Sequence, residues 1–290
     1  MLSHRIPSLL VASHALLGIF LLPGGGCSPS YDPAGTKRPA TTTIRLATTT
    51  SVRDSGLLDR LLPVFEARHS CRVDVIAVGT GAALRLGELG DADALLVHAP
   101  AAEKQFLAAG YATSRTPFMV NYFAILGPAH DPARVRNRPA IDALKKIASG
   151  NYRFVSRGDE SGTHQRERSL WQQAGGRPAW NDYIVSGQGM GATLVIADEM
   201  QAYVLTDYAT YLNFQDKIDL VPLTKPSPAL RNTYSVLTVS PDRHPAVNVQ
   251  MARQLADFFV SAESQNMIRV YRLVGQQLFR PLEPADRPEK

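Results

Sequence analysis

Short apolar runs alternate with segments of helical periodicity along most of the chain. The apolar runs predict strands at residues 44–47, 72–77, 94–97, 118–126, 153–155, 181–185, 202–206 and 234–239. The periodic segments predict helices at residues 55–67, 82–89, 102–109, 140–148, 165–173, 192–199, 207–212 and 248–260. This alternation of strand and helix is typical of α/β proteins.

The predicted elements fall into two stretches. The first ends near Gly127-Pro128, and the second continues to Lys225-Pro226-Ser227-Pro228, after which one more strand and helix follow. From residue 44 to about residue 282, the length suits one large domain or two lobes with their own apolar cores.

Hydroxyl side chains cluster where predicted strands end and helices begin. Thr49, Thr50 and Ser51 follow the strand at 44–47, and Thr80 follows the strand at 72–77 between two glycines. A helix start offers unpaired backbone N–H donors, and Thr and Ser hydroxyls add neutral donors beside them. One such cluster is an ordinary helix cap, whereas several together favour an anion-binding site.

The third cluster also carries a cation. Arg157, Ser161 and Thr163 lie between the strand at 153–155 and the helix at 165–173. Arginine can hold two oxygens of one anion with its planar fork. A fourth helix start, at Met190 and Gly191, offers backbone amides and is equally well explained as a glycine-rich turn.

These motifs resemble, in order along the chain, the tungstate-binding proteins of ABC importers, which are type II periplasmic solute-binding proteins. The resemblance rests on residues 47–56, 78–89, 90–100, 154–164 and 187–194. It implies two α/β lobes joined by a two-strand hinge, with residues 44–126 plus 232–282 in lobe 1 and residues 127–231 in lobe 2. It also implies that the two lobes close around one tetrahedral oxyanion, and that the partners are an ABC permease and its cytoplasmic ATPase.

Three alternatives stay open at this point. Molybdate has the same charge and shape as tungstate, so the donor types do not separate them. Phosphate keeps a proton near neutral pH and favours a carboxylate acceptor, for which Asp54 and Asp159 are available. A serine hydrolase built on Ser161 and His164 is disfavoured, because the chain has no Gly-x-Ser-x-Gly nucleophile motif. We therefore expect a binding protein that is not an enzyme and needs no cofactor or metal.

The first residues predict export. Residues 1–26 combine early basic residues with an apolar stretch, as a secretory signal peptide does. Cys27 follows a sequence that resembles a lipoprotein cleavage site, although Gly24 stands where Leu is expected; a plainly cleaved soluble protein is the alternative. Residues 27–43 then predict a lipid-anchor site and flexible tether, which would hold the protein at the membrane in the periplasm or at the cell surface.

Charge and the remaining titratable residues add little. The net charge is +5 and the pI is near 9.3, but the basic residues are scattered and form no stripe with interleaved aromatics. We therefore expect no nucleic-acid partner. His69 and His98 have no neighbours at metal-ligand spacing, so a core or surface role is expected for both.

Overall fold

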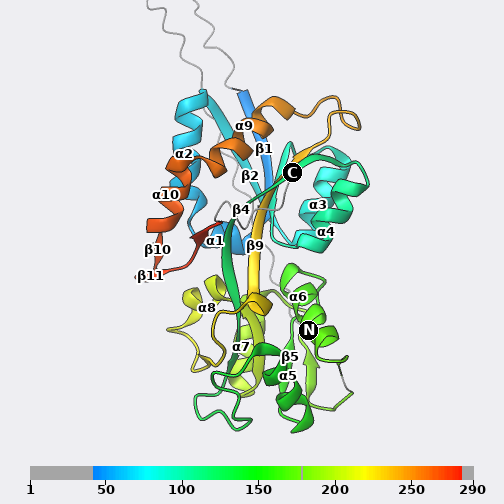
Figure 1. Ribbon diagram of the computed structural model, residues 1–290, viewed down its shortest axis with the longest axis vertical. Helices are drawn as coiled ribbons and strands as arrows, with labels where there is room; N and C mark the ends of the chain where they lie inside the picture. Colours follow the sequence, from blue (N-terminus) through cyan, green and yellow to red (C-terminus); the bar gives the residue numbers. More distant parts are fainter. Residues whose placement is uncertain (1–41, 178, 283–290) are drawn as a thin grey trace, which may run out of the picture. The chain divides into compact units, whose positions relative to one another are not determined.

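Ten strands of the chain form one mixed sheet in the computed structural model, which describes residues 42–177 and 179–282 (Figure 1). The strands are β1 (Thr42–Thr49), β2 (Cys71–Val78), β3 (Ala94–Val97), β4 (Ala112–Gly127), β5 (Phe154–Ser156), β6 (Tyr183–Val185), β7 (Tyr203–Asp207), β8 (Val221–Pro222), β9 (Arg231–Val239) and β12 (Arg280–Pro281). Two further short strands, β10 (Arg272–Leu273) and β11 (Gln276–Gln277), form a separate hairpin.

The helices alternate with the strands over most of the chain, and all but α1 and α10 correspond to helices that the sequence predicts. They are α1 (Thr50–Asp54), α2 (Leu58–His69), α3 (Thr80–Leu89), α4 (Pro100–Ala108), α5 (Ala140–Ser149), α6 (Gly162–Gln173), α7 (Met190–Glu199), α8 (Tyr208–Phe214), α9 (Val249–Val260) and α10 (Ala262–Val270), with a 3₁₀ turn η1 (Pro228–Leu230). None of the helices in the described part of the chain is long and apolar enough to cross a membrane.

The strand order shows two parallel groups that share a central pair. The order is β2-β1-β3-β9-β4-β7-β5-β6, with β8 and β12 pairing with β4 beside this path. Strands β1, β2 and β3 run parallel to one another, as do β5, β6 and β7, while β4 and β9 are antiparallel to their neighbours. The long strand β4 pairs with β9 up to Tyr122 and with β7 from Phe123, so it belongs to both groups.

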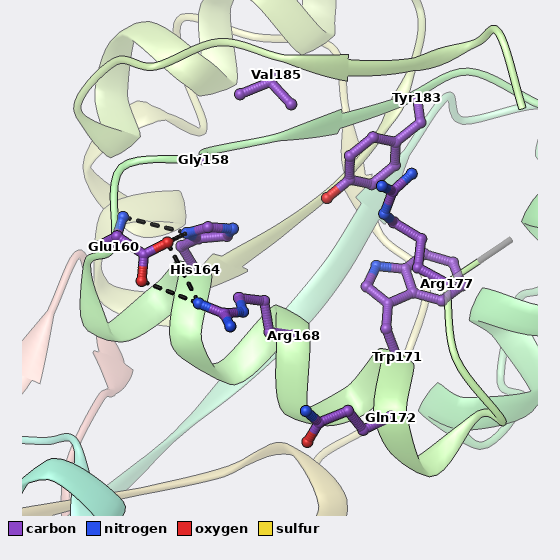
Figure 2. A pocket seen from close by; sticks show the side chains of 9 residues that line it. All are labelled: Gly158, Glu160, His164, Arg168, Trp171, Gln172, Arg177, Tyr183 and Val185. Carbon is purple, nitrogen blue, oxygen red and sulfur yellow. Dashed lines mark hydrogen bonds and ion pairs between the residues drawn. The ribbon is translucent and has the colours of Figure 1, made fainter. Parts of the chain in front are cut away.

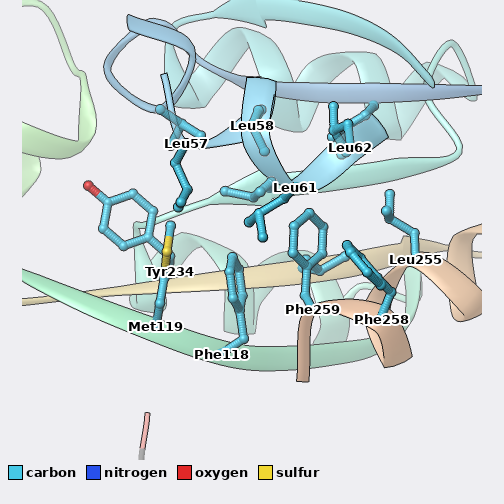
Figure 3. Close-up of a cluster of buried hydrophobic side chains, with 14 of the residues drawn as sticks. Leu57, Leu58, Leu61, Leu62, Phe118, Met119, Tyr234, Leu255, Phe258 and Phe259 are labelled. Atoms are coloured by element: carbon cyan, nitrogen blue, oxygen red, sulfur yellow. The ribbon is translucent and has the colours of Figure 1, made fainter. Parts of the chain in front are cut away.

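Each parallel group has its own buried core. Around β1, β2 and β3, the core on one sheet face contains side chains of α2 and α9 (Figure 3), and the core on the other contains Leu84, Leu95 and Phe106. Around β5, β6 and β7, separate clusters centre on Phe154 and Leu194. These cores confirm two α/β lobes, while the exact lobe limits, 44–126 plus 232–282 and 127–231, stay a prediction.

Two regions differ from the sequence prediction. The helix expected at residues 55–67 is α2, which begins only at Leu58, and the short helix α1 before it was not predicted; Gly56, with a φ of 73°, separates the two. Helix α10 was not predicted, because two polar residues, Ser264 and Gln265, fill buried positions on it. Ser261 caps it by accepting a hydrogen bond from the Ser264 amide at 3.3 Å.

Candidate functional site

The first hydroxyl cluster lies where β1 ends. Thr49 is buried, and its Oγ1 lies 3.1 Å from Oγ of the half-buried Ser51. Thr50 is exposed, so the structure separates it from its two neighbours in the predicted donor set. Thr48, which points to the other face of the strand, donates to the Leu96 carbonyl at 2.8 Å and holds β1 against β3.

Thr80 begins α3 directly after β2, and its side chain is 2% exposed. The residue before it, Gly79, is the N-cap of the helix and supplies no side chain to satisfy the first backbone amides. The open helix start and the buried hydroxyl therefore face the same region as the end of β1, since β1 and β2 are parallel neighbours.

The third cluster forms the loop between β5 and α6. Arg157 makes an ion pair with Asp159, with Nη2 and Oδ2 2.8 Å apart, and its Nε is buried without a hydrogen-bond partner among the described residues. Ser161 is the N-cap of α6 and accepts from the His164 amide at 3.3 Å, while Thr163 is 2% exposed. A buried guanidinium N–H and two hydroxyls are thus held close to one helix start.

Glycine is required in this loop. Gly158 has a φ of 63°, and a Cβ atom on it would lie 2.2 Å from Cγ1 of Val185 on β6. A side chain here would push the loop away from its neighbouring strand and move Arg157.

A buried carboxylate fixes the base of the same loop. Glu167 on α6 accepts hydrogen bonds from Ser156 Oγ at 2.8 Å, Tyr183 Oη at 2.6 Å and Trp171 Nε1 at 3.3 Å. Burial raises the pKa of this carboxyl group, and the three donors oppose that rise. The network joins β5, β6 and α6, so the residue before Arg157 has little freedom to move.

The fourth predicted helix start is tied to Arg157 through its backbone. The Gly187 amide donates to the Arg157 carbonyl at 3.0 Å, which places the β6–α7 loop beside the β5–α6 loop. The Met190 side chain itself packs into the cluster around Leu194, and the Cβ position of Gly191 faces Phe214. Among the described residues, the Met190 side chain makes no hydrogen bond or ion pair with the other predicted donors, and Gly191 could contribute only its backbone.

His98 is a residue that the sequence reasoning assigned to an ordinary core or surface role. It follows β3 directly, is 5% exposed, and its Nε2 lies 3.5 Å from Ser51 Oγ. Its Nδ1 lies 3.1 Å from Oδ1 of Asn232 on β9, and its ring lies 4.8 Å from the ring of Tyr234. The rule that located the hydroxyl clusters, a polar residue at the carboxyl end of a parallel strand, would also have located His98.

The two halves of the predicted donor set meet at His98. A Cβ atom on Gly162, between Ser161 and Thr163, would lie 3.2 Å from His98 Cε1 and 3.2 Å from Thr80 Oγ1. The start of α6 therefore touches the start of α3 and the end of β3. The structure thus brings together Ser51, Thr80, His98 and the Ser161–Thr163 turn, with Arg157 in the loop that leads into that turn.

A pocket of about 440 Å³ is lined by residues of the β5–α6 loop, α6 and β6, among them Gly158, Glu160 and His164 (Figure 2). Glu160 lies there within 3.0 Å of Arg168, and its backbone amide donates to His164 Nδ1 at 3.1 Å. None of the predicted donors lines this pocket.

The hydrogen bonds of His164 argue against a serine hydrolase. Its Nδ1 accepts from the Glu160 amide, and it contacts the Ser161 hydroxyl only through its own backbone amide. In the described part of the chain, no cluster of His, Cys, Asp and Glu could hold a metal ion.

Comparison with known proteins identifies the family. Residues 34–263 match the model of the PBP superfamily domain. The chain is 41% identical over 263 residues to the tungstate-binding protein TupA of Peptoclostridium acidaminophilum, covering 88% of this chain and 92% of that protein. It is 37% identical to TupA of Campylobacter jejuni, covering 79% of this chain and 87% of that protein. The chain belongs to the TupA family.

Solved structures of the family agree with the fold. The tungstate-binding protein TupA of Desulfovibrio alaskensis superposes with a TM-score of 0.77 at 42% identity, covering 83% of this chain and 99% of that one. The tungstate ABC transporter structure from Geobacter sulfurreducens gives a TM-score of 0.73 at 44% identity, with 79% and 98% covered. The TupA family has the bilobed fold of periplasmic binding proteins and is a solute-binding, not an enzymatic, family. The sequence predictions of a bilobed α/β fold and of a solute-binding, non-enzymatic protein are therefore confirmed.

Proposed function

We propose that this protein captures tungstate between its two lobes and delivers it to an ABC transporter. The observation that carries the proposal is the meeting of Thr80, Ser51 and the Ser161–Thr163 turn around His98, because these groups come from three different strand ends. Neutral hydroxyls and one guanidinium suit a fully ionised tetrahedral oxyanion, which accepts hydrogen bonds and donates none. The family relatives named for tungstate support this ligand over its alternatives.

The carboxylates near the site also favour tungstate over phosphate. Asp159 is engaged by Arg157 at 2.8 Å and by the Ser161 amide at 3.2 Å, and Asp54 is exposed and paired with Arg53. A site for protonated phosphate would need a carboxylate directed at the ligand to accept its proton, whereas Asp159 is held by two donors of its own loop and Asp54 is exposed. The proposed ligand-binding residues are Thr49, Thr50, Ser51, Thr80, Arg157, Ser161, Thr163 and the start of α7 at Met190 and Gly191, of which Thr50 and Met190 have the least support.

Calorimetric titration of the mature protein with tungstate, molybdate, sulfate and phosphate tests the proposal. We expect tungstate to bind most tightly and sulfate and phosphate to bind weakly. Molybdate binding as tightly as tungstate would favour a general molybdate and tungstate protein, and preferential phosphate binding would refute the proposed ligand.

Variants of Arg157 test the site. In Arg157→Ala, we expect the Kd for tungstate to rise at least about thirtyfold, roughly 2 kcal/mol, because the anion loses a charge-assisted donor. Arg157→Lys should recover only part of the loss, since an ammonium group cannot hold two oxygens in one plane. The matched control is Arg153→Ala, which removes an exposed arginine at the opposite end of β5, whose ion pair with Asp182 spans 3.6 Å.

Removal of Arg157 also leaves Asp159 without its cation. The double variant Arg157→Ala with Asp159→Asn separates the two effects, because it removes the repulsive carboxylate together with the guanidinium. If the double variant binds tungstate as tightly as the wild type, Arg157 only neutralises Asp159 and does not contact the anion.

Extracytoplasmic placement follows from membership of a periplasmic-binding-protein family. We propose further that Cys27 carries a lipid anchor and that residues 27–43 tether the domain to the membrane, with residues 1–26 removed as a signal peptide. Residues 1–41 lie outside the described part of the structure, so this proposal rests on the sequence alone.

A further inference from the structure

Among residues 42–177 and 179–282, His98 is a buried titratable side chain that touches both halves of the proposed tungstate site. Ser51 lies beside its Nε2, and Gly162 of the other lobe packs against Cε1, between the two ring nitrogens. A histidine that serves packing alone would need no contact with two groups of ligand donors. Its hydrogen bonds show a more specific arrangement.

The neighbours of His98 fix which nitrogen carries the proton in the neutral ring. Oδ1 of Asn232 lies 3.1 Å from Nδ1 of the imidazole, and Nδ2 of the same amide donates to Tyr234 Oη at 3.1 Å. An amide oxygen can only accept, and therefore Nδ1 of His98 is the protonated nitrogen. Nε2 of the neutral ring then has a lone pair, and Ser51 Oγ is 3.5 Å from it.

This arrangement bears on the direction of the Ser51 hydroxyl. Nε2 of the neutral ring can only accept, so a Ser51 hydroxyl that donates to it at 3.5 Å, and not to Thr49 Oγ1 at 3.1 Å, turns only lone pairs toward a ligand. A lone pair repels an oxyanion. If Nε2 gains a proton, the direction reverses: Nε2–H donates to Ser51 Oγ, and the Ser51 hydroxyl proton becomes available to a ligand.

We propose that His98 takes up one proton from solvent when tungstate binds, and that this proton turns the Ser51 hydroxyl toward the anion. The inference rests on the proposed function. The protonated ring also brings a positive charge to the junction of the lobes, where two negative charges of the ligand arrive. Binding of the anion and protonation of His98 thus stabilise each other.

The charged groups around His98 are compatible with the uptake of a proton by its ring. Burial lowers the pKa of the free imidazole, Asp207 on β7 and the hydrogen bond with Asn232 raise it, and Arg157 lowers it; the net shift is downward and favours the neutral ring before ligand binds. Asp207 already accepts two hydrogen bonds from Thr210, at 2.6 and 3.1 Å. Glu103 on α4, the next carboxylate along the chain, is paired with Arg115 at 2.7 Å.

Calorimetry in buffers of different ionisation enthalpy measures the protons taken up with each tungstate. We compare the wild type with His98→Gln, whose side chain keeps an N–H donor but does not titrate, and with His130→Gln, an exposed histidine as control. We expect proton uptake by the wild type and by His130→Gln, and none by His98→Gln. Affinity of the wild type should fall as the pH rises above neutral, by at most about tenfold per pH unit, the limit for one linked proton.

A second measurement needs no variant. The ¹⁵N shifts of the His98 ring in the wild type should change, on addition of tungstate, from those of an unprotonated Nε2 to those of a protonated one. Tungstate binding with no proton uptake, with equal uptake in His98→Gln, or with an unchanged Nε2 shift would overturn this inference alone. Failure of the wild type to bind tungstate would instead overturn the proposed function, and this inference with it.

Discussion

Gly162 provides a direct test of whether the two lobes close on each other through the start of α6. A methyl group at this position would lie 3.2 Å from both His98 Cε1 and Thr80 Oγ1. Ordinary contacts between such atoms are about 3.5–4.0 Å, so in Gly162→Ala either the side chains or the lobes must move apart by several tenths of an ångström. The backbone φ of Gly162 is not in the left-handed region, so the substitution strains no dihedral angle.

The expected effects on binding and on stability have opposite signs. Overpacking of a close contact costs about 1–3 kcal/mol, and the small overlap here places Gly162→Ala near the lower value, about a fivefold rise in the Kd for tungstate. Gly162→Val, with two more carbon atoms, should approach 3 kcal/mol or about 150-fold. Alanine in a helix is up to about 1 kcal/mol more favourable than glycine, so the open, ligand-free protein should melt at the same temperature or a few degrees higher.

The assay is calorimetric titration with tungstate, together with melting curves and small-angle scattering of residues 40–290 with and without ligand. Gly81→Ala is the matched control, because Gly81 lies in the first turn of α3 beside Thr80 and its Cβ position has no atom within 4 Å. We expect tungstate to decrease the radius of gyration of the wild type and of Gly81→Ala, and to do so less for Gly162→Val. If both Gly162 variants bind and compact like the wild type, the lobes do not meet at this point in the bound protein and the argument is refuted.

Two further predictions concern the core and the anchor. Asp93→Asn should destabilise the protein by about 2–3 kcal/mol in urea unfolding, because the buried carboxylate accepts from the Arg45 guanidinium at 2.7 Å and from the Asn248 amide at 2.9 Å. Burial alone would raise the pKa of Asp93, but these donors lower it below its value in the unfolded chain. The stability that the Asp93 carboxylate contributes is therefore present above the unfolded pKa, near 4, and should disappear as the pH falls through the lower pKa of the folded protein. A difference in stability between Asp93→Asn and the wild type that persists in acid would contradict this. Cys27→Ser should move the protein from the membrane fraction to the soluble extracytoplasmic fraction, and an unchanged distribution would show that Cys27 is not the anchor.

The sequence predicted the fold well wherever an apolar run or a helical period was decisive. The strand expected at residues 94–97 is β3 as observed, because all four of its residues are buried and apolar. The ends of elements were less predictable, since they depend on individual backbone conformations such as the positive φ of Gly56. Helix α10 could not be read from periodicity, because its buried face includes polar residues satisfied by tertiary hydrogen bonds such as that from Gln265 to the Phe118 carbonyl.

The sequence predicted correctly which strand ends come together at the site, but it predicted less well which side chains there face inward. A run of hydroxyls does not reveal which members face inward: Thr49 is buried while Thr50 is exposed, although both are threonines one residue apart. His98 was given an ordinary role because sequence spacing cannot show that a partner such as Asn232, far along the chain, lies beside it. The ion pair of Arg157 with Asp159 depends on the turn at Gly158, which only the backbone geometry reveals.

The position of β9 beside β3 and β4 in the sheet affects how fast the chain folds. Strand β3 gains its second neighbour only when β9 arrives, with Ala94 paired to Thr238 and Val97 to Ser235. All of lobe 2 is synthesised between these partners, so the sheet of lobe 1 requires closure of a very long loop. Topologies with such distant pairings fold slowly. We therefore expect the segment between β4 and β9 to acquire structure first and the sheet of lobe 1 to be completed last.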